Sequence, residues 1–388
     1  MENLSRARVA AALSFRQPDI LPLYDNYWEE FVENWMAVRG KIPPAVSSDT
    51  TDTGRDSPAA APPNPKDAAR EAIHDYYGND IVTAAADETP WPSLKARLEE
   101  RPEEGAVISR GGWGETVRTV EGAHFSQELG VALEERVDPD KLSFESPLLE
   151  SRYAHSDALI ARRKGRYALF AKTGGPFKRP SMLRGYTGFL MDMAEDPGWV
   201  RALVERVMDH LIAVGVEQLR RNREHLAGIQ INDDSCSLQG PVMGPRAYER
   251  LCLPSLKRMV KAYKEAGAAC VYMHCDGNAM PLVEMWIDAG LDAMHPCELR
   301  AGVDVFALRQ KHGRKLAFMG AMDNCHILPQ GSQEEITTHI RRLAELGRDG
   351  GLILGGHSIG PDISVEHYEW AMAARARYGR YASAKPVA

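Results

Sequence analysis

Two short segments in the second half of the chain carry residue types that bind divalent metal ions. Residues 273–278 read Met-His-Cys-Asp-Gly-Asn, and residues 355–361 read Gly-Gly-His-Ser-Ile-Gly-Pro. They offer two imidazoles and one carboxylate, from His274, His357 and Asp276. This ligand set suits zinc, iron or another divalent ion and leaves coordination positions open for a substrate. The sequence therefore predicts a metal site at these three residues.

The backbone around His274 supports this prediction and leaves an alternative open. In an extended strand, His274 and Asp276 point to one face while Cys275 points to the other. A purely structural role is the alternative, because a strand-end histidine also bonds neighbouring backbone and Asp-Gly is a turn dipeptide. Cys297 could replace Asp276 as a ligand, although cysteine is also a common small buried residue.

Two adjacent carboxylates, Asp233 and Asp234, follow the apolar run 227–231 and are the candidate catalytic residues. Neighbouring side chains cannot both point inward, so we expect one to cap the next turn and the other to reach the pocket. The inward carboxylate could act as a general base, anchor a substrate or orient a histidine. The sequence does not decide which of the two it is, and capping by both stays an alternative.

Polar and aromatic residues after other apolar runs are candidates for substrate binding. Glu298 and Asp323 could bind polar groups of a substrate, or pair with Arg300 and helix termini. The aromatic residues near the start of the chain could wall the pocket or belong to the core. The candidate substrate-binding residues are Asp25, Tyr27, Trp28, His295, Glu298 and Asp323.

These residues share one arrangement, in which an apolar run precedes a polar residue and then a helix-like stretch. The runs lie at 20–24, 167–171 (followed by Lys172), 227–231, 269–273, 291–294, 316–319 and 351–354. Strands that are apolar on both faces and alternate with helices form a parallel sheet covered by helices. About eight such units favour an α/β fold of the (β/α)8 TIM-barrel type, whose strand ends open on one face and would bring these residues together. A Gly-x-Gly-x-x-Gly motif for an open nucleotide-binding sheet is missing.

The remaining segments are expected to elaborate a single barrel domain over residues 1–388. Residues 43–66, rich in Pro, Ala, Ser, Thr and Asp, are predicted to form a flexible loop insertion. Residues 70–150, with a hairpin near 110–114, are predicted to pack beside the barrel. Helical spacing predicts helices over 6–14, 181–193, 197–221 and 365–378.

The bulk composition excludes several classes of function. A net charge of −7 offers no basic surface for nucleic acid. No stretch approaches the roughly 20 apolar residues that cross a bilayer and no secretion signal precedes the first run, so we expect a cytoplasmic protein without membrane contact. Six cysteines without a Cys-x-x-Cys pair indicate reduced thiols. Motifs for acyl transfer (Gly-x-Ser-x-Gly) and nucleotide hydrolysis (Gly-x-x-x-x-Gly-Lys) are also missing.

Several motifs occur together in an order and spacing that are hard to produce by chance. They are residues 6–9 with 18–19, 174–175 with 183–185, 233–234 with 239–241, 253–257, 274–278, 320–323 and 355–362. With these motifs the chain resembles the uroporphyrinogen decarboxylase superfamily, particularly its methyltransferase-like, corrinoid-linked branch. The resemblance implies a (β/α)8 barrel with its active site at the carboxyl ends of the strands.

Two activities occur in that superfamily, and particular residues of this chain indicate which of them is expected. True uroporphyrinogen decarboxylases carry Arg-Gln-Ala-Gly-Arg after the first strand, where this chain reads Asp-Asn-Tyr-Trp at 25–28. An acidic wall repels a substrate with eight carboxylates, so haem-pathway decarboxylation is disfavoured.

The corrinoid-linked relatives bind zinc through a His-x-Cys pair and a later cysteine. Here His274 keeps its place, while Asp276 and His357 stand where the two cysteines would fall. This harder donor set is better matched to an oxygen substrate than to a thiol, with the metal acting as a Lewis acid. An Asp-x-His-x-x-Gly corrinoid signature is missing, so any corrinoid must come on a partner protein.

The leading hypothesis is therefore a metal-dependent enzyme, with zinc as the expected ion. It would move a methyl group between a small methoxylated compound or alcohol and a corrinoid on a partner protein. One alternative is a decarboxylase of a small carboxylic acid or a porphyrin-like substrate, without a metal. Another is a non-catalytic barrel that binds a ligand or partner. The resemblance also makes a homodimer an expectation.

Overall fold

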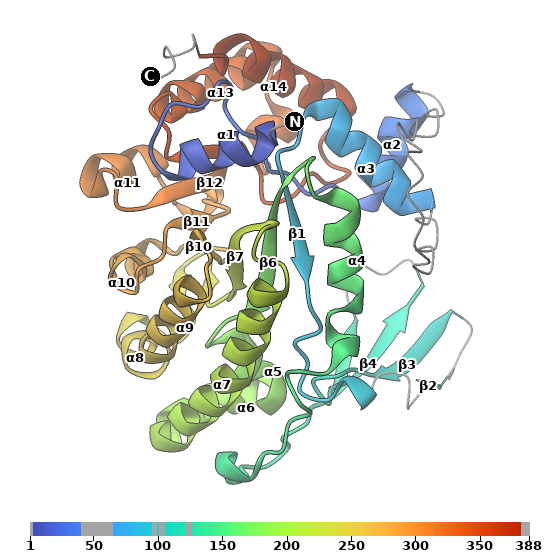
Figure 1. Ribbon diagram of the computed structural model, residues 1–388, viewed down its shortest axis with the longest axis vertical. Coiled ribbons are helices and arrows are strands. Elements are labelled where there is room, and N and C mark those ends of the chain that lie inside the picture. Colours follow the sequence, from blue (N-terminus) through green and yellow to red (C-terminus); the bar gives the residue numbers. More distant parts are fainter. Residues whose placement is uncertain (1–2, 40–64, 95–98, 101–104, 122–125, 382–388) are drawn as a thin grey trace. The chain divides into compact units, whose positions relative to one another are not determined.

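The computed structural model describes residues 3–39, 65–94, 99–100, 105–121 and 126–381 (Figure 1). The chain divides into two compact units. The terminal unit comprises Met1–Val82, Gly165–Ala168 and Met294–Ala388, and the central unit comprises Thr83–Lys164 and Leu169–Ala293. Residues 43–64 of the predicted loop insertion lie outside the described residues, and its end belongs to a helix that begins at Pro65.

The main sheet is built from strands that alternate with helices along the chain, as the repeated apolar runs predict. Its strands are β1 (Ile81–Ala85), β6 (Ala168–Gly174), β7 (Leu226–Asn232), β10 (Cys270–His274), β11 (Ala293–His295), β12 (Ala317–Ala321) and β13 (Leu352–Gly355). They are hydrogen-bonded in the order β1-β6-β7-β10-β11-β12-β13. The pairs β6–β7, β7–β10 and β12–β13 are parallel.

The predicted first strand, residues 20–24, joins the sheet as an irregular segment of the terminal unit. Leu23 forms an isolated parallel bridge with Leu354 of β13, whose carbonyl accepts from the N–H of Tyr24 at 2.8 Å. On the other side, the N–H of Asp80, directly before β1, donates to the carbonyl of Leu23 at 2.8 Å. This segment thus bridges the two end strands of the order. The fold is an α/β barrel of the predicted (β/α)8 class.

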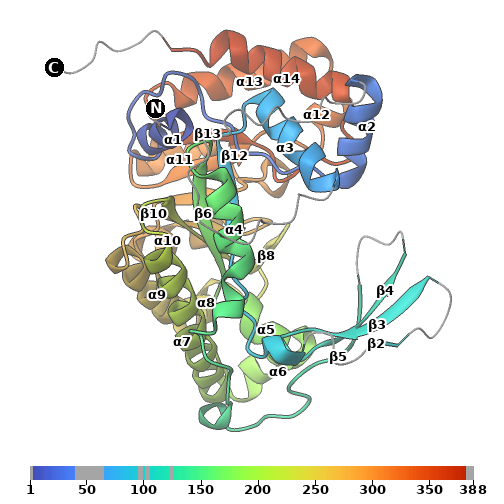
Figure 2. The ribbon, with the colours of Figure 1, turned by 45° about the vertical axis from the view of Figure 1, so that its right-hand side comes forward.

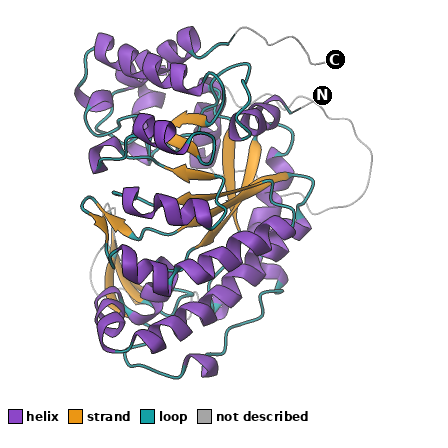
Figure 3. Cartoon of the chain, turned by 90° about the vertical axis from the view of Figure 1, so that its left-hand side faces the viewer, coloured by secondary structure: helices purple, strands orange, loops and turns teal. Residues whose placement is uncertain are grey.

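Helices of the central unit cover one face of its parallel strands (Figure 3). The Oγ1 of Thr173 on β6 lies 3.1 Å from the hydroxyl of Tyr263, which donates to the carbonyl of Leu211 at 3.2 Å. Thr173 therefore faces the helices, and its neighbour Lys172 faces the opposite, inner side of the strand. The helices of this unit are α4 (Ala154–Arg163), α5 (Lys178–Arg184), α6 (Tyr186–Glu195), α7 (Pro197–Arg221), α8 (Pro245–Leu251), α9 (Leu253–Glu265) and α10 (Val283–Asp288).

The helices of the terminal unit surround β12 and β13 with buried apolar side chains. Ile336 and Ile340 of α13 and Tyr368 of α14 are fully buried, and these two helices pack against each other. The helices of this unit are α1 (Leu4–Leu13), α2 (Glu29–Arg39), α3 (Pro65–Tyr77), α11 (Val305–His312), α12 (Ile327–Gln330), α13 (Gln333–Gly347) and α14 (Val365–Tyr378).

A separate antiparallel sheet belongs to the central unit (Figure 2). It is formed by β2 (Glu99–Glu100), β3 (Ala106–Arg110), β4 (Thr116–Val120) and β5 (Gln127–Gly130). The turn between β3 and β4 contains Gly114 with φ of 81°, a backbone conformation that glycine adopts without strain. The hairpin predicted near residues 110–114 is confirmed. Two further short strands, β8 (Cys236–Ser237) and β9 (Gly240–Pro241), form a hairpin after β7.

The helix predictions were accurate where a helix is long and regular. The bounds 197–221 and 365–378 match α7 and α14. The single helix predicted over 181–193 is wrong, because Gly185 with φ of 77° separates α5 from α6. In the part of the chain that the structure describes, no helix combines the length and apolar character needed to cross a membrane.

Candidate active site

The candidate site is built on the inner face of β6, β7 and β10. The pairing register places Lys172 beside Gln230 and Gln230 beside Tyr272, and the next inward-facing positions are Gly174, Asn232 and His274. In a parallel sheet, paired residues point to the same face, so these side chains form two stacked layers. The layer at the strand ends carries Asn232 and His274. The layer beneath it carries Lys172, where the hydroxyl of Tyr272 donates to Gln230 at 2.9 Å.

Two carboxylates approach the imidazole of His274. Its Nε2 lies 3.5 Å from Oδ1 of Asp276 and 3.7 Å from Oδ1 of Asp234. The His274 side chain is 14% exposed, while those of Asp276 and Asp234 are 37% and 27% exposed. The imidazole is therefore held between two carboxylate side chains that are partly exposed. The predicted pairing of His274 with Asp276 on one face is present in the structure.

Asp234 is held in place by Lys178 and Asn232. Lys178, at the start of α5, forms an ion pair with Oδ2 of Asp234, and its Nζ lies 3.4 Å from Oδ1 of Asn232. The amide of Asn232 donates to Oδ1 of Asp234 at 3.4 Å. These contacts orient the carboxylate of Asp234 along the same face as His274.

Asp233 points the other way and caps α5. Its Oδ1 accepts the backbone N–H groups of Phe177 at 2.9 Å and Lys178 at 2.7 Å, and the side chain is completely buried. A methyl group at Gly175 would lie 2.4 Å from Cβ of Asp233, so only glycine allows this close approach. Burial raises the pKa of Asp233 to about 7, while the two backbone donors oppose the rise. Of the two adjacent carboxylates, Asp233 is the capping one and Asp234 the accessible one.

Lys172 and Arg179 add positive charge to the deeper layer. A methyl group at Gly174 would lie 2.2 Å from Nε of Arg179, so this glycine makes room for the arginine beside Lys172. Arg179 forms an ion pair with Glu88 and lies over the ring of Trp113, with Cζ 5.2 Å from its centroid. Burial lowers the pKa of Lys172, and the Arg179 charge adds to that effect.

Cys275 faces away from the carboxylates, as strand alternation predicts. Its Sγ lies 3.6 Å from Oγ of Ser235 and is buried, and burial raises the pKa of the thiol well above its ordinary value. A neutral thiol is a poor metal ligand. All six cysteines lie among the described residues, and no disulfide joins any of them.

In the terminal unit, His357 follows β13 on a loop that Asp25 holds. Oδ1 of Asp25 accepts the N–H of Gly356 at 2.6 Å, and Oδ2 accepts the hydroxyl of Tyr368 at 2.8 Å. The Tyr368 oxygen lies 3.0 Å from that of Tyr27. Burial raises the pKa of Asp25 to about 7. Because both oxygens of Asp25 are hydrogen-bonded and its side chain is buried, this residue stabilises the loop that carries His357.

The other predicted substrate-binding residues occupy different environments within the terminal unit. Asp323 is buried and its Oδ1 accepts from the N–H groups of Cys325 at 3.0 Å and His326 at 2.8 Å, which fixes a turn after β12. His295 is buried against the ring of Tyr24, with centroids 5.2 Å apart. Tyr27 is buried, Glu298 is half-buried, and Trp28 is 38% exposed. Substrate contact by these residues stays a prediction.

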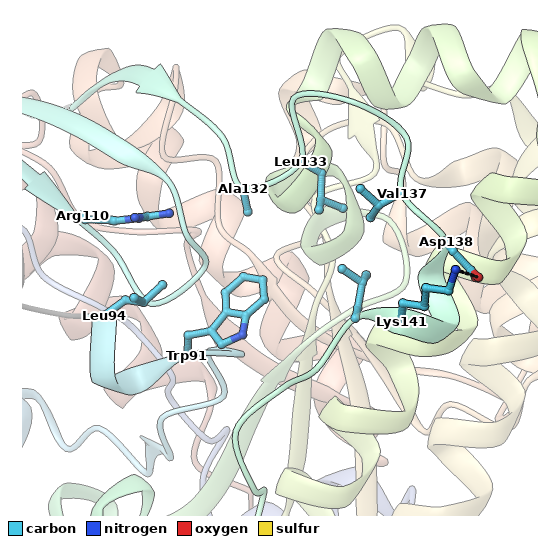
Figure 4. A pocket seen from close by; sticks show the side chains of 9 residues that line it. Trp91, Leu94, Arg110, Ala132, Leu133, Val137, Asp138 and Lys141 are labelled. Carbon is cyan, nitrogen blue, oxygen red and sulfur yellow. Dashed lines mark ion pairs between the residues drawn. The ribbon is translucent and has the colours of Figure 1, made fainter.

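A surface pocket lies elsewhere in the central unit, between the antiparallel sheet and residues 132–142 (Figure 4). Its volume is about 510 Å³, and its wall combines Trp91 and leucines with Arg110 and Lys141. None of the residues predicted to form the active site lines it.

The sequence prediction missed the charged residues that complete the deeper layer. Lys172 was visible as a polar residue after an apolar run, but Arg179, Glu88 and Trp113 carry no local pattern that marks them. Glu88 follows β1, a strand that the sequence analysis did not recognise. Only the packing of three separate segments brings these side chains together.

Comparisons with known proteins agree with this architecture. A family model described as uroporphyrinogen decarboxylase (URO-D) matches residues 130–378. A solved structure titled "methyltransferase from Methanosarcina mazei" is 16% identical, covers 96% of this chain and 98% of that chain, and has a TM-score of 0.67. Xylanase B from Clostridium stercorarium F9 is 12% identical, with coverage of 56% and 74%, but its TM-score of 0.33 is too low to support an argument. A search of curated proteins found no match.

Proposed function

Because the chain belongs to the uroporphyrinogen decarboxylase family, we propose that it is a metal-dependent methyltransferase of that family. The reaction would move a methyl group between a small methoxylated compound or alcohol and a corrinoid carried by a partner protein. The likeness in fold to the Methanosarcina mazei methyltransferase supports the choice of this branch.

The observation that carries the proposal is the pair His274 and Asp276 at the end of β10. Their Nε2 and Oδ1 atoms lie 3.5 Å apart. Two ligand atoms on a tetrahedral zinc ion with bonds of about 2 Å are roughly 3.3 Å apart, so this pair fits the spacing of a chelate. We assign His357 as the third ligand, because it follows a parallel strand of the barrel as His274 does.

The donor set indicates which chemistry the ion would supply. Imidazole and carboxylate donors are harder than the thiolates of thiol-activating sites, which favours an oxygen substrate. When bound, a divalent ion would act as a Lewis acid on an ether or hydroxyl oxygen. Asp276 would supply negative charge for such an ion beside His274, since Asp234 already pairs with Lys178.

Asp234 is the proposed proton carrier of the site. It is accessible, it lies 3.7 Å from the imidazole of His274, and Lys178 and Asn232 fix its orientation. Asp233 is excluded from direct contact with substrate by its complete burial and its role as the cap of α5. We therefore assign Asp234 as the catalytic residue and Asp233 as a residue that stabilises the structure.

Metal analysis of the purified full-length chain tests this proposal. After reconstitution with zinc, we expect one equivalent of bound ion in the unmodified protein and a large loss in His274→Ala and His357→Ala. His155→Ala, at an exposed histidine of α4, is the matched control and should keep the ion. Equal zinc content in the unmodified protein and His274→Ala, or none in either, would overturn the proposal.

A second assay separates methyl transfer from the alternative reaction. Methoxylated donors and a corrinoid protein are incubated with the zinc-loaded enzyme, and methylcorrinoid formation is followed by absorbance. Metal-dependent methylation supports the proposal. Release of carbon dioxide that persists after chelation would instead identify a decarboxylase, and binding without turnover would identify a non-catalytic barrel.

A further inference from the structure

We propose that the substrate of this site carries a carboxylate, and that Lys172 and Arg179 bind it in the layer beneath His274. The inference rests on the proposed function, because it names the substrate class of the same site. It concerns residues of the central unit alone.

Lys172 is a half-buried cation without a partner. Among the residues that the structure describes, its side chain makes no hydrogen bond and no ion pair. It occupies the inner face of β6, since Thr173 faces the covering helices. Burying most of an ammonium group costs free energy unless an anion compensates it, and this cost is reflected in the lowered pKa of Lys172.

Arg179 adds a second donor that has no acceptor. Its Nε is buried and has no hydrogen-bond partner within the described part of the chain, although its terminal nitrogens contact Glu88 and Met182. Gly174 lies on the same face of β6 as Lys172. A methyl group added at Gly174 would collide with Nε of Arg179. The unpaired guanidinium N–H therefore lies against the strand that carries the unpaired ammonium group.

In the layer beneath His274, the ion pairs leave one cation without a counterion. Lys178 is neutralised by Asp234, and Arg179 is neutralised by Glu88, whose Oε2 also accepts the N–H of Gly174 at 2.6 Å. Lys172 alone lacks a counterion within 4 Å among the described residues. A single negative charge, such as that of a carboxylate, balances the layer of Lys172; Asp276 belongs to the layer of His274 above it.

The layers also define the length of the substrate. Lys172 precedes the layer of Asn232 and His274 by one inward-facing position, a rise of about 6.6 Å along the strand. A carboxylate beside Lys172 would place the other end of a short acid near His274. A compact methoxylated carboxylic acid meets both requirements.

The side chains around this subsite include several aromatic rings. The ring of Phe170, one inward position below Lys172, lies 5.4 Å from the ring of Tyr272, and Trp113 lies under Arg179. Such surroundings weaken the competition of water for the two donors and strengthen an ion pair with a bound acid.

Binding measurements test the proposal without depending on turnover. Titration calorimetry on the zinc-loaded full chain compares two acids, methoxyacetate and 4-methoxybenzoate, with the corresponding amides, which have the same shape and no charge. We expect at least one acid to bind about tenfold or more tightly than its amide. Lys172→Met should abolish the preference, Lys172→Arg should retain most of it, and Lys261→Met, at an exposed lysine of α9, should leave it unchanged.

Two controls keep the outcomes distinct. Zinc content and thermal unfolding of Lys172→Met must match the unmodified protein, so that lost binding reports the missing ammonium group. Equal affinity for acids and amides, binding of neither, or a preference that survives in Lys172→Met would each overturn the proposal. One outcome of metal analysis is that the reconstituted chain binds no zinc. If the acids still bind preferentially to that chain, the carboxylate subsite is supported and the metal-dependent function is contradicted.

Discussion

The carboxylate of Asp25 accepts the backbone N–H of Gly356 at 2.6 Å, across 331 positions of the sequence. Gly356 precedes His357, so a residue near the start of the chain fixes the loop that carries a proposed metal ligand. The contact is completely buried, and Tyr368 saturates the second oxygen of the same carboxylate. Asp25 thus acts on the loop through the backbone.

Removing this carboxylate should destabilise the terminal unit. Asp25→Ala leaves the N–H of Gly356 and the hydroxyl of Tyr368 without their acceptor, at a cost of about 1–3 kcal/mol in the free energy of unfolding. Tyr368→Phe, which removes one donor and keeps the carboxylate, should cost less. Urea denaturation near pH 6 measures both, with Asp362→Ala at an exposed position as the control. Equal stability of Asp25→Ala and the control would contradict the buried contact.

The two adjacent carboxylates should respond differently to substitution. Asp234→Asn should lower kcat by about 10²–10⁴, the range of a lost general acid or base, with little change in stability. Asp233→Asn should instead lower stability, because its amide group would bury new donors where Oδ2 now has no partner among the described residues. Steady-state kinetics and thermal unfolding of the two variants are the measurements. A catalytic loss confined to Asp233→Asn would reverse the assignment.

The buried acids predict a fall in stability as pH rises. Burial raises the pKa values of Asp25 and Asp233 to about 7, whereas an unfolded aspartate titrates near 3.8. Between these values the folded chain holds more protons than the unfolded chain, so this contribution to the free energy of unfolding decreases from about pH 4 to pH 7. Urea titrations at a series of pH values should show a shallower decrease in Asp233→Asn. A steeper decrease in that variant would contradict the raised pKa of Asp233.

Gly174 should be essential to the position of Arg179. Gly174→Ala places a methyl group where Nε, Cγ and Cδ of Arg179 now lie, so the guanidinium group must leave Glu88 and the inner face. We expect weaker binding of carboxylic acids, by about tenfold, together with a loss of stability of about 1–3 kcal/mol. Gly198→Ala in α7 is the control, since its methyl group meets an ordinary contact at 3.4 Å. Unchanged affinity in Gly174→Ala would show that Arg179 has no part in binding.

Elements with a strong local sequence signal were predicted correctly, and elements without one were missed. The helix from Pro197 to Arg221 was predicted at both ends, because proline at its first turn and an unbroken helical spacing are local signals. The break at Gly185 was missed, since a glycine with positive φ can end a helix within an otherwise continuous apolar pattern. The strand at 81–85 was missed because it is only five residues long and ends in two alanines, a residue type depleted in strands.

In the candidate site, too, local pattern predicted some of the relationships between residues and not others. The side-by-side placement of His274 and Asp276 followed from strand alternation alone. The choice between Asp233 and Asp234 required the position of α5, which supplies the N–H groups that Asp233 accepts. The partnership of Arg179 with Glu88 joins two distant segments, and no period in the sequence encodes it.

The bridge between Leu23 and Leu354 bears on the order of events during synthesis. The segment at residues 20–24 is synthesised well before its partner strand β13, because the two are far apart in the sequence. Until β13 has been made, the nascent chain must hold this apolar segment without its permanent neighbour, exposed to misassembly or to chaperones. Closure of the barrel is therefore a late, long-range step, and the high sequence separation of this contact will slow it.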